Sequence, residues 1–249
     1  MKLLKVNEDY ETIGRILGKA ELTSLIKPVC RDIEVDEACE AAKKYRFHSV
    51  AAMPAQIPRV LEKLQGSGVR TTCIMDMMGG ATSSWPALEL TFLEFIKAGV
   101  NEFDLMAGLD RLAANNFDGV KGQWQHFADI AHRGGCELYA TIEEGLFDDK
   151  TKLMLCKLAL EAGADGIRTC TGCLELCGMP TGRATIHDIC LITGAFGDKL
   201  LVKAGGGTDF GYLEDALEYL ECGAGFVDLG STALKQLIDL NYERKEQIG

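Results

Sequence analysis

The stretch Phe95-Ile-Lys-Ala-Gly-Val-Asn-Glu-Phe-Asp-Leu105 decides the fold, because the same pattern occurs twice more along the chain. In each copy a helical stretch ends in a small-residue turn, and a short apolar strand follows that closes on a polar residue. The other copies are Leu160-Glu-Ala-Gly-Ala-Asp-Gly-Ile-Arg168 and Leu220-Glu-Cys-Gly-Ala-Gly-Phe-Val-Asp228. Their turn glycines lie 64 and 60 residues apart, about twice the roughly 30 residues of one strand-plus-helix unit. Two such units therefore separate successive copies.

Filling in the intermediate units predicts eight short strands that alternate with helices. The expected strands are Leu22–Ile26, His48–Ala52, Arg70–Met75, Glu102–Leu105, Leu138–Ile142, Gly166–Arg168, Leu200–Ala204 and Phe226–Leu229. Apolar residues recur at three and four in the stretches between them, as in Val35–Tyr45, Ile57–Leu64, Lys150–Glu161 and Leu213–Cys222. Such alternation implies an all-parallel sheet, and 249 residues suit a closed (β/α)₈ TIM barrel. An open doubly wound sheet is the alternative architecture.

The chain carries no Pro-rich or Ser-rich linker that would divide it. We therefore expect a single barrel domain over residues 1–249, with residues 1–20 as an N-terminal helical extension. Within that extension, Val6–Lys19 has the character of a helix that covers the bottom of the barrel.

Composition narrows the classes of function. The net charge is −11, so the molecule repels nucleic acid and anionic membrane surfaces. No apolar run approaches the roughly 20 residues that a membrane span needs, and Met1–Thr12 lacks the features of a secretory signal. A cytoplasmic location is expected, and in a reducing compartment the ten cysteines would be free thiols, metal ligands or core residues. Cys39, Cys156 and Cys222, on helices, and Cys73, in a strand, are expected to be core thiols.

Two glycine-containing loops indicate a phosphate site. Three glycines in Val202-Lys-Ala-Gly-Gly-Gly-Thr208 follow the seventh strand, and Asp228-Leu-Gly-Ser-Thr232 adds a glycine and two hydroxyls after the eighth. Loops after these two strands commonly bind phosphate in barrels, through backbone N–H groups and a helix N-terminus. A loop selected only for turn geometry is the other explanation. The predicted phosphate-binding residues are Gly172, Gly206, Gly207, Gly230, Ser231 and Thr232.

Catalytic groups of a barrel lie where its strands end. The charged residues at those positions are Asp76, Asp104, Glu143, Arg168 and Lys203. A strand-end lysine with a lowered pKa supplies the neutral amine that attacks a carbonyl to form a Schiff base. The competing role for Lys203 is to neutralise Asp104 or a bound phosphate.

The motifs together resemble those of the deoxyribose-phosphate aldolases, over nearly the whole chain. They are Leu25-Ile-Lys-Pro28, Gly66-Ser-Gly-Val-Arg70, Ala98-Gly-Val-Asn-Glu-Phe-Asp104, Ile142-Glu-Glu-Gly-Leu146, Ala162-Gly-Ala-Asp-Gly-Ile-Arg-Thr-Cys-Thr-Gly172 and Val202-Lys-Ala-Gly-Gly-Gly207. The resemblance implies a (β/α)₈ lyase that cleaves or forms a carbon–carbon bond in a phosphorylated sugar through a lysine Schiff base, without metal. It also implies that Asp104 is the proton-relay residue, that Lys203 is the second, pKa-lowering lysine, and that Gly206, Gly207 and Gly230 contact phosphate.

The chain departs from that family at several positions. Where the family has its Schiff-base lysine, in a Lys-Thr-Ser-Thr-Gly motif, this chain has Arg168-Thr-Cys-Thr-Gly172, and a guanidinium offers no nucleophilic lone pair. Leu22 stands where an acidic residue is expected, Asp76-Met-Met78 replaces Gly-Phe-Pro, and the loop Cys173–Gly182 is longer and different in composition. An altered substrate, either a phosphorylated sugar or a short aldehyde or ketone, is therefore expected.

Two mechanisms remain open at this point. In the favoured one, Lys203 forms the imine, the charge of Arg168 lowers the pKa of Lys203, and Asp104 shuttles protons. In the other, Arg168 and Lys203 grip a carboxylate or phosphate. That second arrangement suits a non-covalent sugar-phosphate lyase or isomerase, or a sugar-phosphate binding protein without turnover.

Cys170, Cys173 and Cys177 form a C-x₂-C-x₃-C cluster that has the spacing of a zinc or iron–sulfur site. A structural site usually needs a fourth ligand, for which the candidates are only His187, Glu175 or a distant cysteine such as Cys30, and small residues in a tight loop explain the cluster as well. We therefore expect no metal and no cofactor. The expected partner is a phosphorylated small molecule, and a homo-oligomer is expected from base rates alone.

Overall fold

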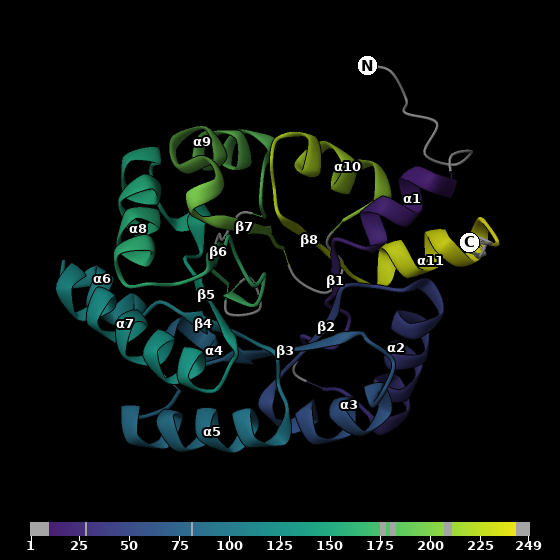
Figure 1. The fold of residues 1–249 in the computed structure, drawn as a ribbon. Helices are drawn as coiled ribbons and strands as arrows, with labels where there is room; N and C mark the ends of the chain where they lie inside the picture. The colour runs from purple at the N-terminus through teal and green to yellow at the C-terminus, as the bar shows by residue number, and fades with distance from the viewer. Residues whose placement is uncertain are drawn as a thin grey trace.

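A closed barrel of eight parallel strands forms the centre of the computed structural model, with the helices outside it (Figure 1). The structure describes residues 10–27, 29–80, 82–174, 178–179, 183–206 and 211–242. The strands are β1 Ala20–Leu22, β2 Ser49–Ala52, β3 Arg70–Met75, β4 Glu102–Met106, β5 Glu137–Thr141, β6 Gly166–Arg168, β7 Leu201–Ala204 and β8 Phe226–Leu229. Each strand pairs with the next along the chain, and β8 closes the ring on β1. The predicted barrel is confirmed, and the open sheet is excluded.

Helices connect successive strands and cover the outer face of the barrel. The α-helices are α1 Tyr10–Leu17, α2 Asp32–Tyr45, α3 Ile57–Leu64, α4 Met77–Gly80, α5 Trp85–Ala98, α6 Leu109–Ala113, α7 Phe117–Arg133, α8 Asp149–Glu161, α9 Ile186–Phe196, α10 Leu213–Glu221 and α11 Ser231–Asp239. Short 3₁₀ turns are η2 Pro54–Gln56, η3 Glu144–Leu146 and η5 Gly197–Lys199. Within the predicted N-terminal helix, the described part is α1, which packs against α10 and β1. No helix in the described part of the chain has both the length and the apolarity to cross a bilayer.

The first strand differs from the predicted Leu22–Ile26. It spans Ala20–Leu22, and the chain then turns, with the Ile26 amide donating to the Thr23 carbonyl at 3.0 Å. The apolar pair Leu25-Ile26 resembles a strand in sequence, but both side chains are buried beyond the strand end. Ile26 contributes there to a small apolar group at the mouth of the barrel, which we call the mouth cluster: Ile26, Ala51, Ile74, Met77 and Cys173, with Met53 packed against it.

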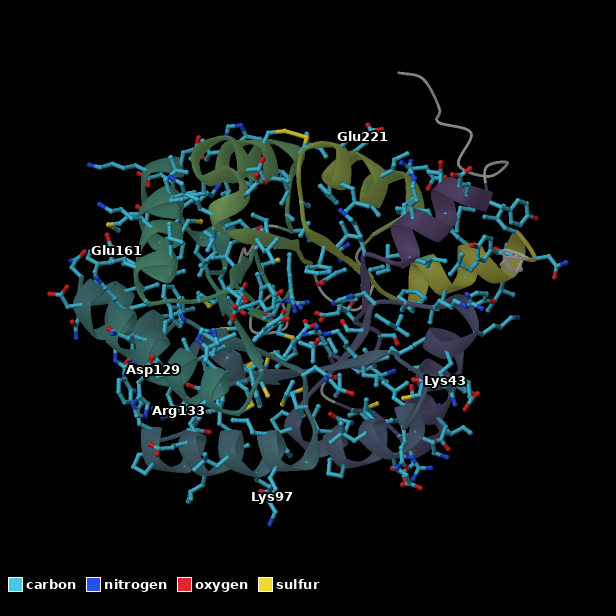
Figure 2. All side chains as sticks on the ribbon, viewed as in Figure 1. Lys43, Lys97, Asp129, Arg133, Glu161 and Glu221 are labelled. Carbon is cyan, nitrogen blue, oxygen red and sulfur yellow. A yellow bond between two sulfur atoms is a disulfide. The ribbon has the colours of Figure 1, made fainter. Side chains whose placement is uncertain are left out.

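The cysteines do not all remain free thiols. Cys190 of α9 and Cys222 at the end of α10 form a disulfide, visible as the yellow bond between these helices in Figure 2. Their Cα atoms lie 5.3 Å apart, within the range that a disulfide spans. The prediction that Cys222 is a core thiol is therefore wrong. Cys39, Cys73 and Cys156 are buried free thiols, as predicted.

The barrel leaves no space for a side chain at Gly166. A Cβ at this position would overlap the Leu201 carbonyl oxygen and lie 2.8 Å from the Tyr139 ring. We expect Gly166→Ala to lower the free energy of unfolding by about 1–3 kcal/mol, as overpacking does. Gly122→Ala is the control, because no atom lies within 4 Å of its added Cβ on α7. In urea titrations the control should gain up to about 1 kcal/mol, and equal effects of both variants would contradict this packing.

Candidate active site

The interior of the barrel holds a network of buried charges, which we call the interior network: Glu21 of β1, Glu102 and Asp104 of β4, Arg168 of β6, Lys203 of β7 and Asp228 of β8. Each of these side chains is at most 1% exposed. They meet because side chains alternate along a strand, and one alternate set of every strand points into the barrel. By contrast, the labelled charged residues in Figure 2, such as Lys97 and Arg133, stand on the outside.

Lys203 is an ammonium bound by carboxylates. Its Nζ donates to Glu102 Oε2 at 2.8 Å, to Asp104 Oδ1 at 3.0 Å and to Glu21 Oε2 at 3.3 Å. The Nζ also lies 3.9 Å from the centroid of the Tyr139 ring, a cation–π contact. Burial lowers the pKa of Lys203, but the three carboxylates outweigh burial and raise it well above its ordinary value. The expectation that the pKa of Lys203 is lowered overall is therefore wrong.

Arg168, like Lys203, donates hydrogen bonds to several other groups of the protein. Its Nη1 donates to Glu21 Oε1 at 2.5 Å and to Asp104 Oδ2 at 2.8 Å, its Nη2 donates to Asp228 Oδ2, and its Nε donates to the Cys170 carbonyl at 3.2 Å. The structure thus brings Lys203, Asp104 and Arg168 together, as predicted. It also places three further carboxylates around the two cations, which the sequence analysis did not assign to the site.

The carboxylates of the interior network differ in their electrostatics. Burial raises the pKa of Glu21, but Lys203 and Arg168 outweigh it and lower this pKa overall. The pKa of Glu102 is lowered in the same way, by Lys203 and by hydrogen bonds from His48 and Lys203. Burial raises the pKa of Asp104 in spite of Lys203, and it raises that of Asp228 to about 8.

Glu21 is an acidic residue next to a position where the chain departs from the family pattern. Leu22 was identified as the residue that replaces an acid at the first strand, yet Glu21 supplies a buried carboxylate one residue earlier. Its Oε2 accepts from Ser49 Oγ at 2.9 Å, in addition to its contacts with Arg168 and Lys203. The signal in the sequence was a single acidic residue between the apolar Ala20 and Leu22.

Two other strand-end acids lie outside the interior network. Asp76 Oδ1 accepts hydrogen bonds from Thr82 and Ser83, so this carboxylate orders the loop after β3. Glu143 Oε1 accepts from the backbone and the hydroxyl of Thr171. Of the adjacent methionines, Met77 lies in the mouth cluster, whereas Met78 is 45% exposed.

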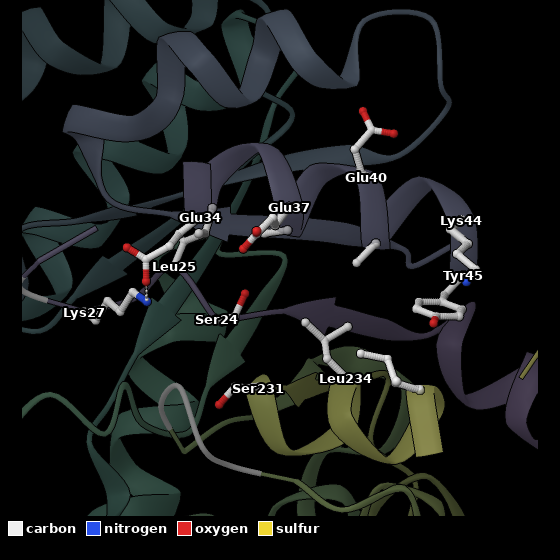
Figure 3. Close-up of a pocket in the computed structure, with 13 residues that line it drawn as sticks. Ser24, Leu25, Lys27, Glu34, Glu37, Glu40, Lys44, Tyr45, Ser231 and Leu234 are labelled. Carbon is white, nitrogen blue, oxygen red and sulfur yellow. Dashed lines mark hydrogen bonds and ion pairs between the residues drawn. The ribbon is translucent and has the colours of Figure 1, made fainter. Parts of the chain in front are cut away.

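The predicted phosphate residues that the structure describes lie after the ends of β6, β7 and β8. The Gly206 amide is 3.4 Å from Asp228 Oδ2, and Gly230 precedes the first turn of α11, which contains Ser231 and Thr232. Gly172 has a positive φ of 69° in the loop after β6. Gly207 lies outside the described residues. Ser231 lines a groove of about 820 Å³ between α2 and α11, together with Ser24 and Lys27 (Figure 3).

The described cysteines of the predicted cluster are not arranged as metal ligands. The Cys170 thiol is fully buried and donates to the Gly205 carbonyl at 3.2 Å, and burial raises its pKa well above the ordinary value. Cys173 packs in the mouth cluster, and Cys177 lies outside the described residues. Among the residues that are described, Asp149, His187 and Asp188 do converge, but Lys152 Nζ already lies 2.6 Å from Asp188.

Comparison with known proteins shows the family to which this chain belongs. No family model matches the chain. It is 32% identical to the deoxyribose-phosphate aldolase of Streptococcus sanguinis over 202 residues, which cover 81% of this chain and 86% of that protein. The chain belongs to the deoxyribose-phosphate aldolase family. The aldolase of Staphylococcus epidermidis is 30% identical over 89% of this chain and 96% of its own length.

A solved structure shows the same fold as this member of the aldolase family. The deoxyribose phosphate aldolase from Aeropyrum pernix, described as a tetramer, superposes with a TM-score of 0.78 and 21% identity, covering 92% of each chain. An aldolase called QR15 gives a TM-score of 0.75 at 19% identity, over 92% of this chain and 97% of that one. At these identities the likeness concerns the barrel.

Removal of the Lys203 ammonium from the interior network should strongly destabilise the protein. Lys203→Met leaves carboxylates buried without a counter-charge, so the free energy of unfolding at pH 7 should fall by about 3–5 kcal/mol in urea titrations. Lys121→Met is the control, because it removes a partly exposed ion pair with Glu161 that is worth at most about 1 kcal/mol. A loss for Lys203→Met no larger than that of the control would show that Lys203 is not held as an ammonium.

Proposed function

We propose that this aldolase-family protein is a lyase that acts on a small phosphorylated carbonyl compound at the mouth of the barrel, and that it works by proton transfer without an imine. The observation that carries the proposal is the state of Lys203: its Nζ lies within 3.3 Å of three carboxylates. An amine attacks a carbonyl only through its neutral form. Raising the pKa of Lys203 removes that form at neutral pH.

The proposed substrate site combines three parts. The phosphate is held by the backbone of Gly206 and the N-terminal turn of α11, with Ser231 and Thr232 beside it. The carbon chain packs on the mouth cluster. The reacting groups face the interior network, where Asp104 is the base that takes a hydroxyl or α-carbon proton, and Arg168 and Lys203 hold the charge that develops.

An altered substrate is part of this proposal. The relatives are named for deoxyribose phosphate, but this chain differs at the ends of β3 and β6, where Met77 and Cys173 lie in the mouth cluster. These side chains restrict the carbon chain that fits. A phosphorylated sugar or short aldehyde or ketone with a hydroxyl next to the reacting bond meets the chemical requirements.

The second candidate is an imine at Lys203. Its support is the 3.0 Å hydrogen bond to Asp104, a carboxylate with a raised pKa that is placed to receive the ammonium proton. A sugar-phosphate binding protein without turnover is the third. One experiment separates the three.

The experiment combines turnover with borohydride trapping. The protein is incubated with deoxyribose phosphate and a panel of phosphorylated aldoses and ketoses, substrate loss is measured, and intact mass is recorded after reduction. We expect consumption of at least one compound without a covalent adduct. The Streptococcus sanguinis relative, treated in parallel, is the positive control for trapping.

Each other result selects a different candidate. An adduct that peptide mapping assigns to Lys203 would replace the proposal with the imine mechanism. Thermal stabilisation by phosphorylated compounds without consumption would leave a binding protein.

The family also bears on assembly. We infer that the chain forms a homo-oligomer, because the related Aeropyrum pernix enzyme is described as a tetramer. The molar mass from light scattering decides this point.

A further inference from the structure

Within the described residues, Asp228 is the carboxylate of the interior network that charged groups stabilise least. It lies near the end of β8 and is 1% exposed. Its Oδ2 accepts from Arg168 Nη2 and, at 3.4 Å, from the Gly206 amide. Its Oδ1 is buried and has no hydrogen-bond partner in the described part of the chain. A buried carboxylate oxygen without a partner is costly, so this atom is suited to carry a proton or to contact a ligand.

The balance of charges in the interior network also indicates that one of its carboxyl groups carries a proton. Four carboxylates of the interior network face two interior cations. Arg70 is a third cation, but it pairs both with Glu102 Oε1, at 2.6 Å, and with Glu137 Oε1, at 2.8 Å. Carboxylates therefore outnumber cations in this buried, low-dielectric region. A bound proton reduces this excess of negative charge.

The contacts of each carboxylate indicate which one holds that proton. Glu21 and Asp104 each accept hydrogen bonds from both Arg168 and Lys203, and Glu102 accepts from Lys203 and pairs with Arg70. Among the described residues, Arg168 is the one charged group that donates a hydrogen bond to Asp228. Burial raises the pKa of Asp228 to about 8, in spite of Arg168. The charged or titratable groups that act on Asp228 are Glu21 from β1, Asp104 from β4, Arg168 from β6, Cys170 after β6 and Lys203 from β7.

The position of Asp228 relates this proton to the proposed substrate. Asp228 lies beside the Gly206 amide on one side, and Gly230 and α11 follow it two residues later. A Cβ at Gly205 would lie 2.9 Å from Asp228 Oδ2, so only glycine fits against this carboxyl. In the proposed site, a compound whose phosphate rests on the Gly206 amide and the first turn of α11 would place its first carbons towards Asp228.

We propose that Asp228 is the acid of this site, a neutral carboxyl group that donates its proton to the carbonyl oxygen of the substrate. The inference rests on the proposed function and names a catalytic residue for it. In the retro-aldol direction, Asp104 takes the proton of the hydroxyl, the carbon–carbon bond breaks, and its electron pair forms the enol double bond. The carbonyl oxygen takes the proton of Asp228. Tautomerisation then restores both groups: the α-carbon of the enol takes the proton held by Asp104, and the enol oxygen returns its proton to Asp228 as the ketone or aldehyde forms.

Infrared difference spectroscopy tests the protonation of Asp228 directly. The spectrum of Asp228→Asn is subtracted from that of the wild-type protein, which removes the contribution of Glu144, another buried carboxyl group with a raised pKa. At pH 7 we expect a protonated-carboxyl band in the difference spectrum, which is lost as pH rises through about 8. Bound deoxyribose phosphate, or the compound that the panel identifies, should shift that band through the hydrogen bond to the carbonyl oxygen.

Kinetics with the identified substrate provide the second readout. Wild-type kcat should fall as pH rises through about 8, because the ionised carboxylate has no proton to donate. Asp228→Asn should lower kcat at least 100-fold with a small change in KM, and it should lose this alkaline limb. Asp129→Asn, an exposed residue on α7, is the control and should match the wild type.

The outcomes distinguish failure of the inference from failure of the proposed function. Absence of the difference band at pH 7, or a band that no bound ligand shifts, overturns the role of Asp228. Retention of the alkaline limb in Asp228→Asn overturns it as well. A borohydride adduct at Lys203 overturns the non-covalent mechanism and leaves the band unaffected. Should Asp228→Asn not fold, ¹³C NMR of labelled aspartate in the wild-type protein decides whether a carboxyl titrates near pH 8.

Discussion

The ion pairing of Arg168 and Lys203 with four carboxylates is the interaction on which the rest of the barrel depends. Buried charged groups are tolerated only when each has counter-charges and hydrogen bonds. Every one of the six side chains comes from the barrel wall, so the strands must keep their register for the network to close. The glycine at position 166 and the ring of Tyr139 belong to the same arrangement, because the ring lies against both Gly166 and the ammonium of Lys203.

The network also determines what chemistry is available. A lysine beside one arginine would be a poor proton acceptor and a good nucleophile, whereas a lysine among three carboxylates remains charged. The same neighbours that hold Lys203 as an ammonium leave an excess of negative charge. Under the proposed function, Arg168 and its carboxylates therefore supply proton carriers in place of a nucleophile.

Much of this molecule could be predicted from sequence, and the limits are physical. Seven of the eight strands lie within one residue of their predicted ends, because apolar runs and turn glycines repeat along the chain. The first strand was displaced, since Leu25 and Ile26 are buried at the mouth rather than in the sheet. Asp104, Arg168 and Lys203 were predicted to meet. Glu21, Glu102 and Asp228 were not predicted to belong to the site. Glu21 lies 147 residues from its partner Arg168, so sequence spacing does not reveal their contact. The direction in which the pKa of Lys203 shifts depends on all of these charges together.

The disulfide between α9 and α10 has a topological consequence for this site. Cys190 and Cys222 are separated by 32 positions, and the segment between them contains β7 with Lys203 and Gly205. That segment is a covalently closed ring. A protease that cuts the backbone once inside the ring leaves the two halves of the protein joined, so the strand that carries the ammonium stays tethered to both.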